Sequence, residues 1–341
     1  EFSNSYRIIA IVHKKEIFEE FHNIEFIEFP KSANSYLYRI YLEYFYFKKL
    51  SKQLKPHLWF SLHDITPNVC AENRAVYCHN PSPFYKASIR EFLLEPNFLI
   101  FNFLYHFFYV KNINNNDFIV VQQNWLRDEF VRRFSVDNVI VAQPSLDSIN
   151  FALQKDHPSQ TIKKGEKVIF FYPAFPRVFK NIEVLCKAVK VLKHKGICNF
   201  ELWLTIDGSE NRYSRQIISK YSSCSNIKFK GLQTRESVFA MYRESTALLF
   251  PSKLETWGLP ITEFKKTNKP MIVADLPYAH EAVGQYGNVT FFYANDADQL
   301  ANIMQSLIDN KFNPQGNHAV QLKEPFVTGW RALFDFILQV K

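Results

Sequence analysis

The sequence predicts an α/β protein made of two doubly wound domains. Its 341 residues are enough for two units that each bury a hydrophobic core. Short apolar runs of strand length alternate with longer segments of helical periodicity, most regularly in the second half. Because strands separated by helices form parallel sheets, we expect helices to cover both faces of parallel sheets.

The first half contains apolar runs that we assign to strands at residues 6–13, 24–29, 57–62, 75–78, 117–121 and 139–142. A long aromatic segment, residues 36–54, and a shorter one, residues 125–134, are assigned to helices. His63 follows the third of these strands, and His79 follows the fourth. Ligands of open α/β sheets bind at the carboxyl ends of the strands, so both histidines are candidates for function. A lone histidine is more often structural, and that alternative stays open for each.

Residues 92–110 form the most apolar stretch of the chain. Glu95, Pro96, Asn102 and His106 interrupt it, so it does not suit a span across a bilayer. It is either a helix of the core or an aromatic face that rests on a membrane surface. We see no basic flank beside it, which favours the core helix.

A polar segment with Pro158, residues 144–165, is expected to link the two domains. Beyond it we assign strands to residues 167–172, 200–206, 227–229, 247–250, 271–274 and 289–292. Helices are expected between these strands, notably at residues 181–194 and 235–244. Residues 326–340 follow Pro325 and are typical of an amphipathic helix.

The positive charge of the chain is confined to its second half. Residues 1–150 hold 16 basic and 16 acidic side chains, whereas residues 151–341 hold 25 and 17, which accounts for the whole net charge of +8. This asymmetry favours an anionic small molecule as ligand of the second domain. No lysine or arginine run and no aromatic RNA-binding motif is present, so no nucleic-acid partner is expected.

The five cysteines are scattered and include no C-x-x-C pair, which is typical of free thiols in a reducing compartment. We find no signal peptide and no apolar run of membrane-spanning length. These features favour a cytoplasmic protein. The first residue is Glu1 rather than methionine, and we interpret the start as trimmed.

Residues 247–281 carry the pattern of an anion site. An apolar strand is followed by a loop with Glu255, then by Gly258 and by Pro260, which we place as the first helical residue. Glu263 is expected in the first helical turn, where a carboxylate suits the helix dipole, and a second acidic loop follows with Asp275 and Glu281. Free N–H groups near Gly258 and Leu259 would hold a diphosphate, and the carboxylates would accept hydrogen bonds from sugar and ribose hydroxyls. An ordinary βαβ turn with a capped helix is the alternative.

The pattern P-S-x-x-E-x-x-G-L-P-x-x-E, from Pro251 to Glu263, resembles the E-x7-E signature of family 4 glycosyltransferases. The family's usual small residue after the second glutamate is replaced here by Phe264. The resemblance implies the GT-B fold, in which two Rossmann-like domains face each other across a cleft and a C-terminal helix crosses back to the first domain. We therefore expect an acceptor-side domain at residues 1–150, a nucleotide-sugar-binding domain at residues 151–324 and the crossover helix at residues 325–341.

The resemblance extends to further segments. The loop P-A-F-P-R-V-F-K-N resembles the one that supplies a basic pair to the donor diphosphate, here Lys180 and, at a closer spacing than is usual, Arg177. Gly208 lies in a segment similar to the family's strand-end glycine loop. Lys230 lies in one similar to the strand whose backbone reads the nucleotide base. V-Y-C-H-N-P-S-P-F-Y resembles the segment that carries a first-domain histidine beside the reacting sugar, which is His79.

These likenesses imply a division of labour among the candidate residues. The residues implied in catalysis are Glu255, His79, Lys180 and Arg177. Those implied in binding the donor are Glu263, Gly258, Leu259, Pro260, Lys180, Arg177, Gly208 and Lys230. Glu255 would hold the donor sugar and Glu263 the ribose, while the basic pair and the helix start would stabilise the leaving diphosphate.

The implied activity is transfer of a hexose-type sugar, with retained configuration, from a UDP- or GDP-sugar to a hydroxyl of a glycan or polyprenyl-linked acceptor. We expect a role in bacterial surface polysaccharide synthesis, at the inner face of the plasma membrane with a peripheral membrane contact. No cofactor and no metal are expected. Asp296-Ala297-Asp298 spells the D-x-D metal motif of another glycosyltransferase fold, but it precedes a helix, and we interpret Asp296 as a cap.

One departure from the family concerns the start of the chain. Family members begin with a strand and a Gly-rich loop, whereas the first glycine here is Gly165. We expect either that this piece is missing or that the acceptor site is built differently. A catalytically silent nucleotide-binding module with the same fold remains the alternative, and it would bind without turnover. A dehydrogenase is disfavoured because no G-x-G-x-x-G is present.

Overall fold

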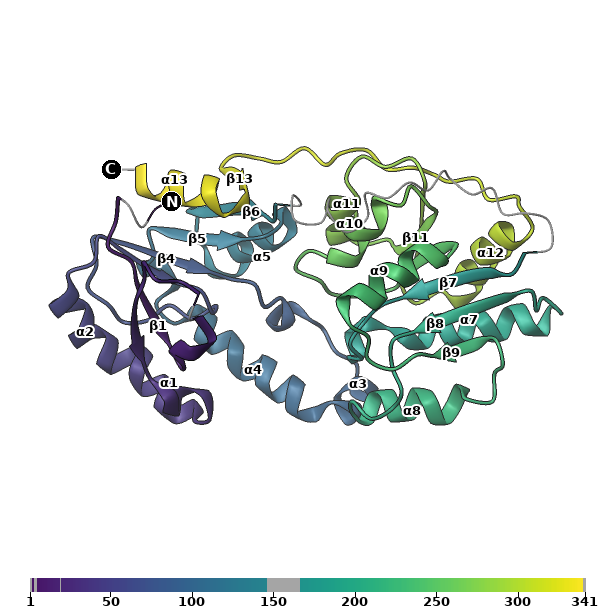
Figure 1. Cartoon of the computed structure of the whole chain (residues 1–341), viewed down its shortest axis with the longest axis horizontal. Helices are drawn as coiled ribbons and strands as arrows, with labels where there is room; N and C mark the ends of the chain where they lie inside the picture. Colours follow the sequence, from purple (N-terminus) through teal and green to yellow (C-terminus); the bar gives the residue numbers. More distant parts are fainter. Residues whose placement is uncertain (1, 3–4, 19, 146–165, 340–341) are drawn as a thin grey trace.

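The computed structural model describes residues 2, 5–18, 20–145 and 166–339 (Figure 1). Two parallel sheets, of six and five strands, form the centres of two domains, and a two-stranded parallel sheet lies beside the smaller one. Most of the predicted linker, including the boundary expected between residues 150 and 151, lies outside the described residues. Short 3-10 turns accompany the main elements at η2 Lys15–Phe18, η3 Pro30–Ala33, η5 Ser82–Phe84, η6 Ile113–Asn115 and η8 Val178–Lys180.

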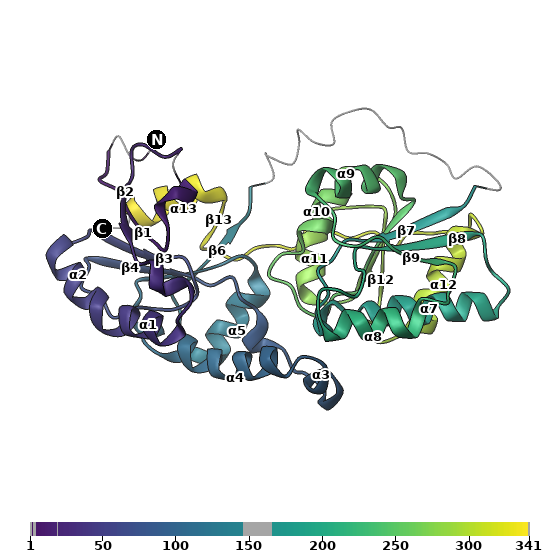
Figure 2. The same ribbon diagram turned by 60° about the horizontal axis from the view of Figure 1, so that its bottom comes forward.

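The six-stranded sheet belongs to the second half of the chain and has the order β12-β11-β10-β7-β8-β9. Its strands are β7 Val168–Tyr172, β8 Phe200–Leu204, β9 Ile227–Phe229, β10 Ala247–Phe250, β11 Met271–Ala274 and β12 Val289–Phe292. Its helices are α7 Ile182–His194, α8 Arg212–Tyr221, α9 Arg235–Glu244, α10 Leu259–Lys265, α11 Pro277–Val283 and α12 Ala297–Ile308. Figure 2 shows α7, α8 and α12 on one side of this sheet and α9 and α10 on the other, so the expected doubly wound arrangement is confirmed.

The five-stranded sheet has the order β13-β6-β5-β4-β3 and is also parallel throughout. Its strands are β3 Leu58–Ser61, β4 Asn73–Tyr77, β5 Phe118–Val121, β6 Val139–Gln143 and β13 Phe326–Thr328. Helices α3 Ile89–Leu94, α4 Pro96–Val110 and α5 Asn124–Phe134 connect them. Buried aliphatic residues of β4, β5 and β6 pack against aromatic side chains of α4 and α5 to form the core of this domain.

The end of the chain returns to the first domain, and it does so partly as a strand. We expected a helix from residue 326, but residues 326–328 form β13, which pairs with β6. The helix prediction is therefore wrong for these three residues, because they extend the sheet of a domain that is distant in sequence. Helix α13, Gly329–Gln339, then packs Leu333 and Ile337 against Val120 and Ile140. The crossover helix is thus confirmed (Figure 1).

Residues 36–54 form one continuous helix, as predicted. It consists of α1 Tyr36–Tyr41, a π-helical turn η4 Leu42–Tyr46 and α2 Phe47–Leu54. Ser35 caps its start by accepting a hydrogen bond from the N–H of Tyr38 at 3.2 Å. Buried Leu42, Phe47 and Leu50 hold the helix against the N-terminal strands.

Helix α4 is buried on one face and exposed on the other. Asn102 and Tyr109 are buried, whereas Ile100, Phe103 and Phe107 are at least half exposed. The expectation of a core helix is therefore wrong for one face, because only one side of α4 packs on the sheet. Helix α3 ends at Leu94, and Glu95 separates it from α4. Among the described residues, no helix is long and apolar enough to cross a membrane.

A cavity divides the strands at the start of the chain from the five-stranded sheet. Strand β1, Ile9–Val12, pairs with β2, Glu25–Glu28, and among the described residues neither pairs with β3. The cavity has a volume of about 960 Å³ and is lined by successive residues, 6–13 on one side and 54–63 on the other. Because alternate side chains of a strand point to opposite faces, lining by every residue means that the backbone edges of β1 and β3 face the cavity.

Candidate active site

The carboxyl ends of β7 and β10 bring two predicted residues into direct contact. Lys180 closes the turn after β7, and Glu255 lies in the loop after β10. Lys180 Nζ lies 2.5 Å from Glu255 Oε1, and both side chains are largely buried. Since β7 and β10 are neighbouring parallel strands, the residues that follow them meet at one edge of the sheet. A cation and a carboxylate that were both predicted for donor binding therefore form one ion pair.

Helix α10 begins directly after this loop. Gly258 is its N-cap and has φ +85°, a left-handed conformation that favours glycine, and an added Cβ would approach Ile261 Cδ1 to 3.3 Å. Leu259 is the first helical residue and is exposed, so Pro260 is the second rather than the first. The left-handed turn at Gly258 starts the helix one residue earlier than the proline rule indicated.

Glu263 is buried in the second turn of α10. The expectation that it would lie in the first turn is wrong for the same reason. Its Oε2 accepts a hydrogen bond from the hydroxyl of Tyr242 at 3.0 Å, and its Oε1 lies 3.3 Å from Nη2 of Arg235. Burial raises the pKa of the Glu263 carboxyl above its usual value, while the bonds from Tyr242 and Arg235 act in the opposite direction.

Two further candidates lie at the same edge of the sheet. Gly208 follows β8 and has φ +96°, and an added Cβ would lie 3.1 Å from Ile218 Cγ1. Its N–H donates to Oε2 of Glu210 at 3.0 Å. Lys230 directly follows β9, and its Nζ lies 4.4 Å from the centre of the Trp203 ring. With Lys180 and the loop after β10, the candidates thus occupy the ends of four adjacent strands.

Arg177 is engaged by the other domain. Its Nη1 lies 3.0 Å from Oε1 of Glu95, the residue between α3 and α4. The other oxygen of this buried carboxylate accepts a hydrogen bond from the N–H of Val178 at 2.9 Å. The structure therefore brings Lys180 to Glu255 but ties the Arg177 guanidinium to Glu95 instead.

His79 follows β4 and is oriented by Asp64, a buried residue that sequence reasoning did not select. Asp64 Oδ1 accepts the backbone N–H of His79 at 2.6 Å and lies 3.4 Å from its ring Nδ1. The hydroxyls of Tyr105 and Tyr109 also donate to this carboxylate, at 3.1 and 2.9 Å. The signal in the sequence was the pair His63-Asp64 at the end of a strand, of which only the histidine was weighed.

His63 lies in a different environment from His79. Its Nε2 is 2.7 Å from Oε1 of Glu43, a buried residue of the π-helical turn η4. It lines the cavity between β1 and β3. His63 thus has a structural partner in Glu43, and it lines a different cavity from the one that His79 lines.

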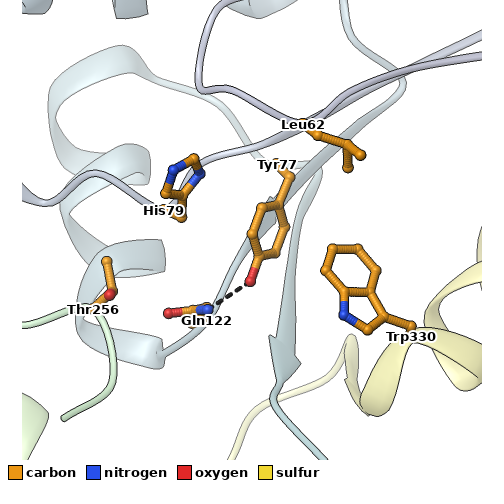
Figure 3. A pocket seen from close by; sticks show the side chains of 6 residues that line it. All are labelled: Leu62, Tyr77, His79, Gln122, Thr256 and Trp330. Carbon is orange, nitrogen blue, oxygen red and sulfur yellow. Dashed lines mark hydrogen bonds between the residues drawn. The ribbon is translucent and has the colours of Figure 1, made fainter. Parts of the chain in front are cut away.

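A second cavity joins the two domains at His79. It has a volume of about 310 Å³ and is lined by Leu62, Tyr77, His79, Gln122, Thr256 and Trp330 (Figure 3). Tyr77 lies between His79 and Trp330, with its ring centre 5.8 Å from the first and 5.1 Å from the second. Gln122 Nε2 donates to the Tyr77 hydroxyl at 2.6 Å. Because Thr256 is the neighbour of Glu255, the cavity connects His79 to the donor-side loop.

Specific hydrogen bonds hold the domains together beside this cavity. Glu281 accepts the backbone N–H groups of Asn124 and Trp125 at 2.9 and 3.0 Å, and thus caps helix α5 of the first domain. The buried Gln123 donates to the carbonyl oxygen of Tyr278 at 3.1 Å. We expected Glu281 in a loop, but it lies in α11, where it faces the other domain. Burial raises the pKa of its carboxyl.

Asp296 is a helix cap, as predicted. Its side chain accepts a hydrogen bond from the N–H of Gln299 at 2.8 Å at the start of α12. Over the part of the chain that the structure describes, no group of three or more histidine, cysteine, aspartate or glutamate side chains is arranged to hold a metal ion. The D-x-D pattern at residues 296–298 is accounted for by the cap.

Known proteins resemble the chain both in sequence and in structure. An O-antigen chain mannosyltransferase B from Escherichia coli is 28% identical over 211 residues, which cover 59% of this chain and 54% of that protein. The O-antigen chain mannosyltransferase RfbU from Salmonella typhimurium is 22% identical over 242 residues, which cover 70% and 60%. The match thus spans less than two thirds of the length of these relatives.

Two solved structures have the same fold. A glycosyltransferase from Rickettsia africae matches with a TM-score of 0.61 at 15% identity, over 90% of this chain and 81% of its own. The lipopolysaccharide outer core galactosyltransferase WaaB matches with a TM-score of 0.59 at 13% identity, over 89% and 79%. With its two Rossmann-like domains and its crossover helix, the chain has the GT-B fold.

The sequence profile of one family covers most of the second domain. The family described as "Glycosyl transferases group 1" matches residues 153–324, half of the chain. The match includes Lys180 and Glu255, which form the ion pair at the carboxyl edge of the six-stranded sheet, and Glu263, which binds Tyr242. The chain therefore belongs to the group 1 glycosyltransferase family.

Proposed function

We propose that the chain is a retaining glycosyltransferase of family 4. It moves a hexose-type sugar from a UDP- or GDP-sugar to a hydroxyl of a glycan or polyprenyl-linked acceptor. The observation that carries the proposal is the ion pair between Lys180 and Glu255, placed at a sheet edge beside a cavity shared by both domains. The O-antigen mannosyltransferases among its relatives support a role in bacterial surface polysaccharide synthesis.

The donor diphosphate binds, in this proposal, between Lys180 and the start of α10. A lysine ammonium has three donors, so Lys180 Nζ can keep Glu255 and also bind a phosphate oxygen. Arg177 reaches the diphosphate by exchanging Glu95 for phosphate, since a guanidinium binds either anion with two parallel hydrogen bonds. Two cations stabilise the negative charge that grows on the diphosphate as its bond to the sugar breaks.

The two glutamates bind hydroxyl groups of the donor. One oxygen of Glu255 pairs with Lys180, which leaves the other oxygen to accept a sugar hydroxyl and to orient the anomeric carbon. Glu263 accepts the ribose hydroxyls, while Tyr242 and Arg235 hold its carboxylate in place. Gly208 and Lys230, at the ends of β8 and β9, lie on the side that we assign to the nucleotide base.

The acceptor binds in the cavity between the domains. His79 points into this cavity beside Thr256, where it can donate a hydrogen bond to the reacting sugar (Figure 3). Tyr77 and Trp330 offer aromatic faces, and Gln122 offers an amide, a combination suited to the apolar face and the hydroxyl rim of a sugar ring. Attack occurs on the face from which the diphosphate leaves, so the anomeric configuration is retained.

The cavity between β1 and β3 accepts, we further propose, one more parallel strand. The support is that the backbone edges of both strands face the cavity along their whole length. Glu43 lines its carboxyl end, and its buried Oε2 has no hydrogen-bond partner among the residues that the structure describes. A strand with a following loop at this position would supply N–H donors to Glu43.

Nucleotide binding is the experiment that tests the proposed function. Isothermal titration calorimetry with UDP and with GDP, in EDTA, is expected to show binding of one of them without a metal. Glu263→Ala and Lys180→Met are each expected to weaken it by about 10- to 100-fold, as befits a lost hydrogen bond to a charged group. Lys187→Met, at an exposed position of α7, is the matched control and leaves the affinity unchanged.

Transfer is then measured with a panel of UDP- and GDP-hexoses and with glycan and polyprenyl-linked acceptors. Product with retained configuration supports the proposal. Tight binding without transfer to any acceptor would instead establish the chain as a silent nucleotide-binding module. The absence of nucleotide binding to the folded protein would overturn the donor site itself.

A further inference from the structure

The long N-terminal helix carries an apolar stripe on its outer face. Leu37, Tyr41 and Phe45 lie four residues apart and are therefore neighbours on the helix surface, and each is at least half exposed. Tyr36 is exposed beside them. The opposite face of the helix, with Leu42, holds it on the domain, so the stripe points away from the core.

Helix α4 carries a second stripe of the same kind. Ile100, Phe103, Leu104, Phe107 and Val110 recur at intervals of three or four residues, and all are about half exposed or more. Phe103 is 69% exposed, which is unusual for a phenylalanine. No charged residue occurs from position 96 to position 110. The outer face of this helix thus carries exposed apolar side chains from Ile100 to Val110.

Both stripes lie on one side of the molecule. Figure 2 shows helices α1 and α4 below the strands of the first domain, with α13 above them. Lys111, which follows α4, places its Nζ 4.1 Å from the ring centre of Tyr44 in the neighbouring helix. Because each helix turns its buried face toward the strands, the two exposed stripes face outward together.

Basic side chains accompany these stripes. Along residues 35–56 the exposed charged residues are Arg39, Lys48, Lys49, Lys52 and Lys55, and the one acidic residue, Glu43, is buried. Lys48, Lys49 and Lys52 continue the outer face of the helix beyond Phe45. In addition to Lys111, which directly follows α4, the tertiary structure thus brings lysines of another helix beside the stripes. Aromatic and aliphatic side chains rimmed by lysines are typical of surfaces that bind anionic lipid.

We propose that this face, which we call the α1–α4 face, docks on the surface of an anionic lipid bilayer. The aromatic stripes enter the boundary between headgroups and acyl chains, and the lysines bind the headgroups. Charge selects this occupant over a second copy of the chain, since two identical cationic faces repel each other. The proposal deepens the proposed function, on which it rests for a polyprenyl-linked acceptor, because docking here would bring the chain to the bilayer that holds such an acceptor.

Vesicle co-sedimentation of the whole chain, without nucleotide, tests the proposal. Vesicles of phosphatidylcholine with 30% phosphatidylglycerol are expected to bind the chain, whereas vesicles of pure phosphatidylcholine are expected to bind it weakly. Addition of 0.5 M NaCl is expected to weaken binding to the anionic vesicles and to reduce the difference in affinity between the two kinds of vesicle. The triple variant Lys48→Ala, Lys49→Ala, Lys52→Ala is expected to lose binding on the order of 100-fold. The variant Phe45→Ser, Phe103→Ser, Phe107→Ser is expected to lose at least about 10-fold.

Matched substitutions on the second domain serve as controls. One control is the triple variant Lys187→Ala, Lys266→Ala, Lys311→Ala, which removes the same number of exposed lysines. The other is the double variant Leu232→Ser, Tyr293→Ser, which removes exposed apolar side chains. Both control variants are expected to bind vesicles like the original chain. The proposal would be overturned if the original chain failed to bind anionic vesicles, or if the control variants lost as much vesicle binding as the variants of the α1–α4 face. It would also be overturned if the original chain formed a dimer that the variant carrying Phe45→Ser dissociates. Calorimetric nucleotide binding, measured without vesicles, reports on the donor site independently, so the two proposals can fail separately.

Discussion

The carboxylate of Asp64 lies 3.4 Å from Nδ1 of His79 and accepts the backbone N–H of the same residue at 2.6 Å. The carboxylate is buried, whereas the imidazole reaches into the cavity between the domains. This carboxylate fixes the backbone at His79 and lies beside the imidazole ring that lines the cavity. Asp64 therefore acts as a positioning residue for His79.

Asp64→Asn is expected to lower the free energy of unfolding by about 1–3 kcal/mol, because an amide replaces an acceptor that serves several donors. Transfer is expected to fall as well, since His79 loses its orientation, while nucleotide affinity stays the same. Urea unfolding, calorimetry and initial rates measure the three quantities. Asp137→Asn, at an exposed position, is the control and should change none of them. Unchanged transfer in folded Asp64→Asn would contradict the positioning role.

Glu263 gives the protein a pH dependence of known sign. Burial raises the folded pKa of this carboxyl above its unfolded value, so between the two pKa values the folded state binds more protons than the unfolded state. The free energy of unfolding therefore falls as pH rises from the unfolded pKa through the folded one. Glu281 contributes in the same direction. Glu91 and Glu201 have lowered pKa values and contribute in the opposite direction, so the contribution of Glu263 is isolated by comparison with Glu263→Gln. In urea unfolding from pH 4 to pH 8, the free energy of unfolding of the original chain relative to that of Glu263→Gln is expected to fall as pH rises.

Nucleotide binding is expected to depend on pH in the opposite sense. Ribose hydroxyls donate hydrogen bonds to the ionised carboxylate, so affinity should weaken as pH falls through the folded pKa of Glu263. Calorimetry at several pH values measures this change. A pH-independent affinity would show that Glu263 does not bind the ribose in its ionised form.

Trp330 is expected to act on the acceptor and not on the donor. Its ring is half exposed in the cavity beside Tyr77, so Trp330→Ala should remove a stacking face with little loss of stability (Figure 3). We expect the KM for the acceptor to rise by about 5-fold, in keeping with an aromatic contact of about 1 kcal/mol. Trp330→Phe keeps an aromatic ring and should recover most of the affinity. If Trp330→Ala changed the affinity for the nucleotide and left the KM for the acceptor unchanged, Trp330 would belong to the donor site and not to the acceptor site.

Hydrogen exchange is expected to distinguish the strands that border the larger cavity. Amides of β1 and β3 that face the cavity should exchange much faster than those of β5, which is buried between two neighbouring strands. Mass spectrometry of peptides covering residues 6–13, 54–63 and 117–122 measures the difference. Equal protection of all three would show that the edges of β1 and β3 are already covered.

The sequence alone determined the local structure and the residues of the donor side. The strand boundaries of the second domain follow from short apolar runs bounded by turn residues, signals that are local in sequence. Glu255, Glu263 and Lys180 were selected because chemical type and spacing are also local properties. Even here the left-handed turn at Gly258 shifted the helix start, so the predicted first-turn position of Glu263 was wrong.

Only the tertiary structure decided which residues meet. The ion pair of Lys180 with Glu255, the bond of Arg177 to Glu95 and the contact of Asp64 with His79 join positions that no period in the sequence relates. The same holds for β13, whose three residues look helical in sequence but complete a sheet nearly two hundred residues earlier in the chain. Local patterns fix the elements, whereas burial and hydrogen bonding between distant segments fix the site and the surfaces that remain exposed.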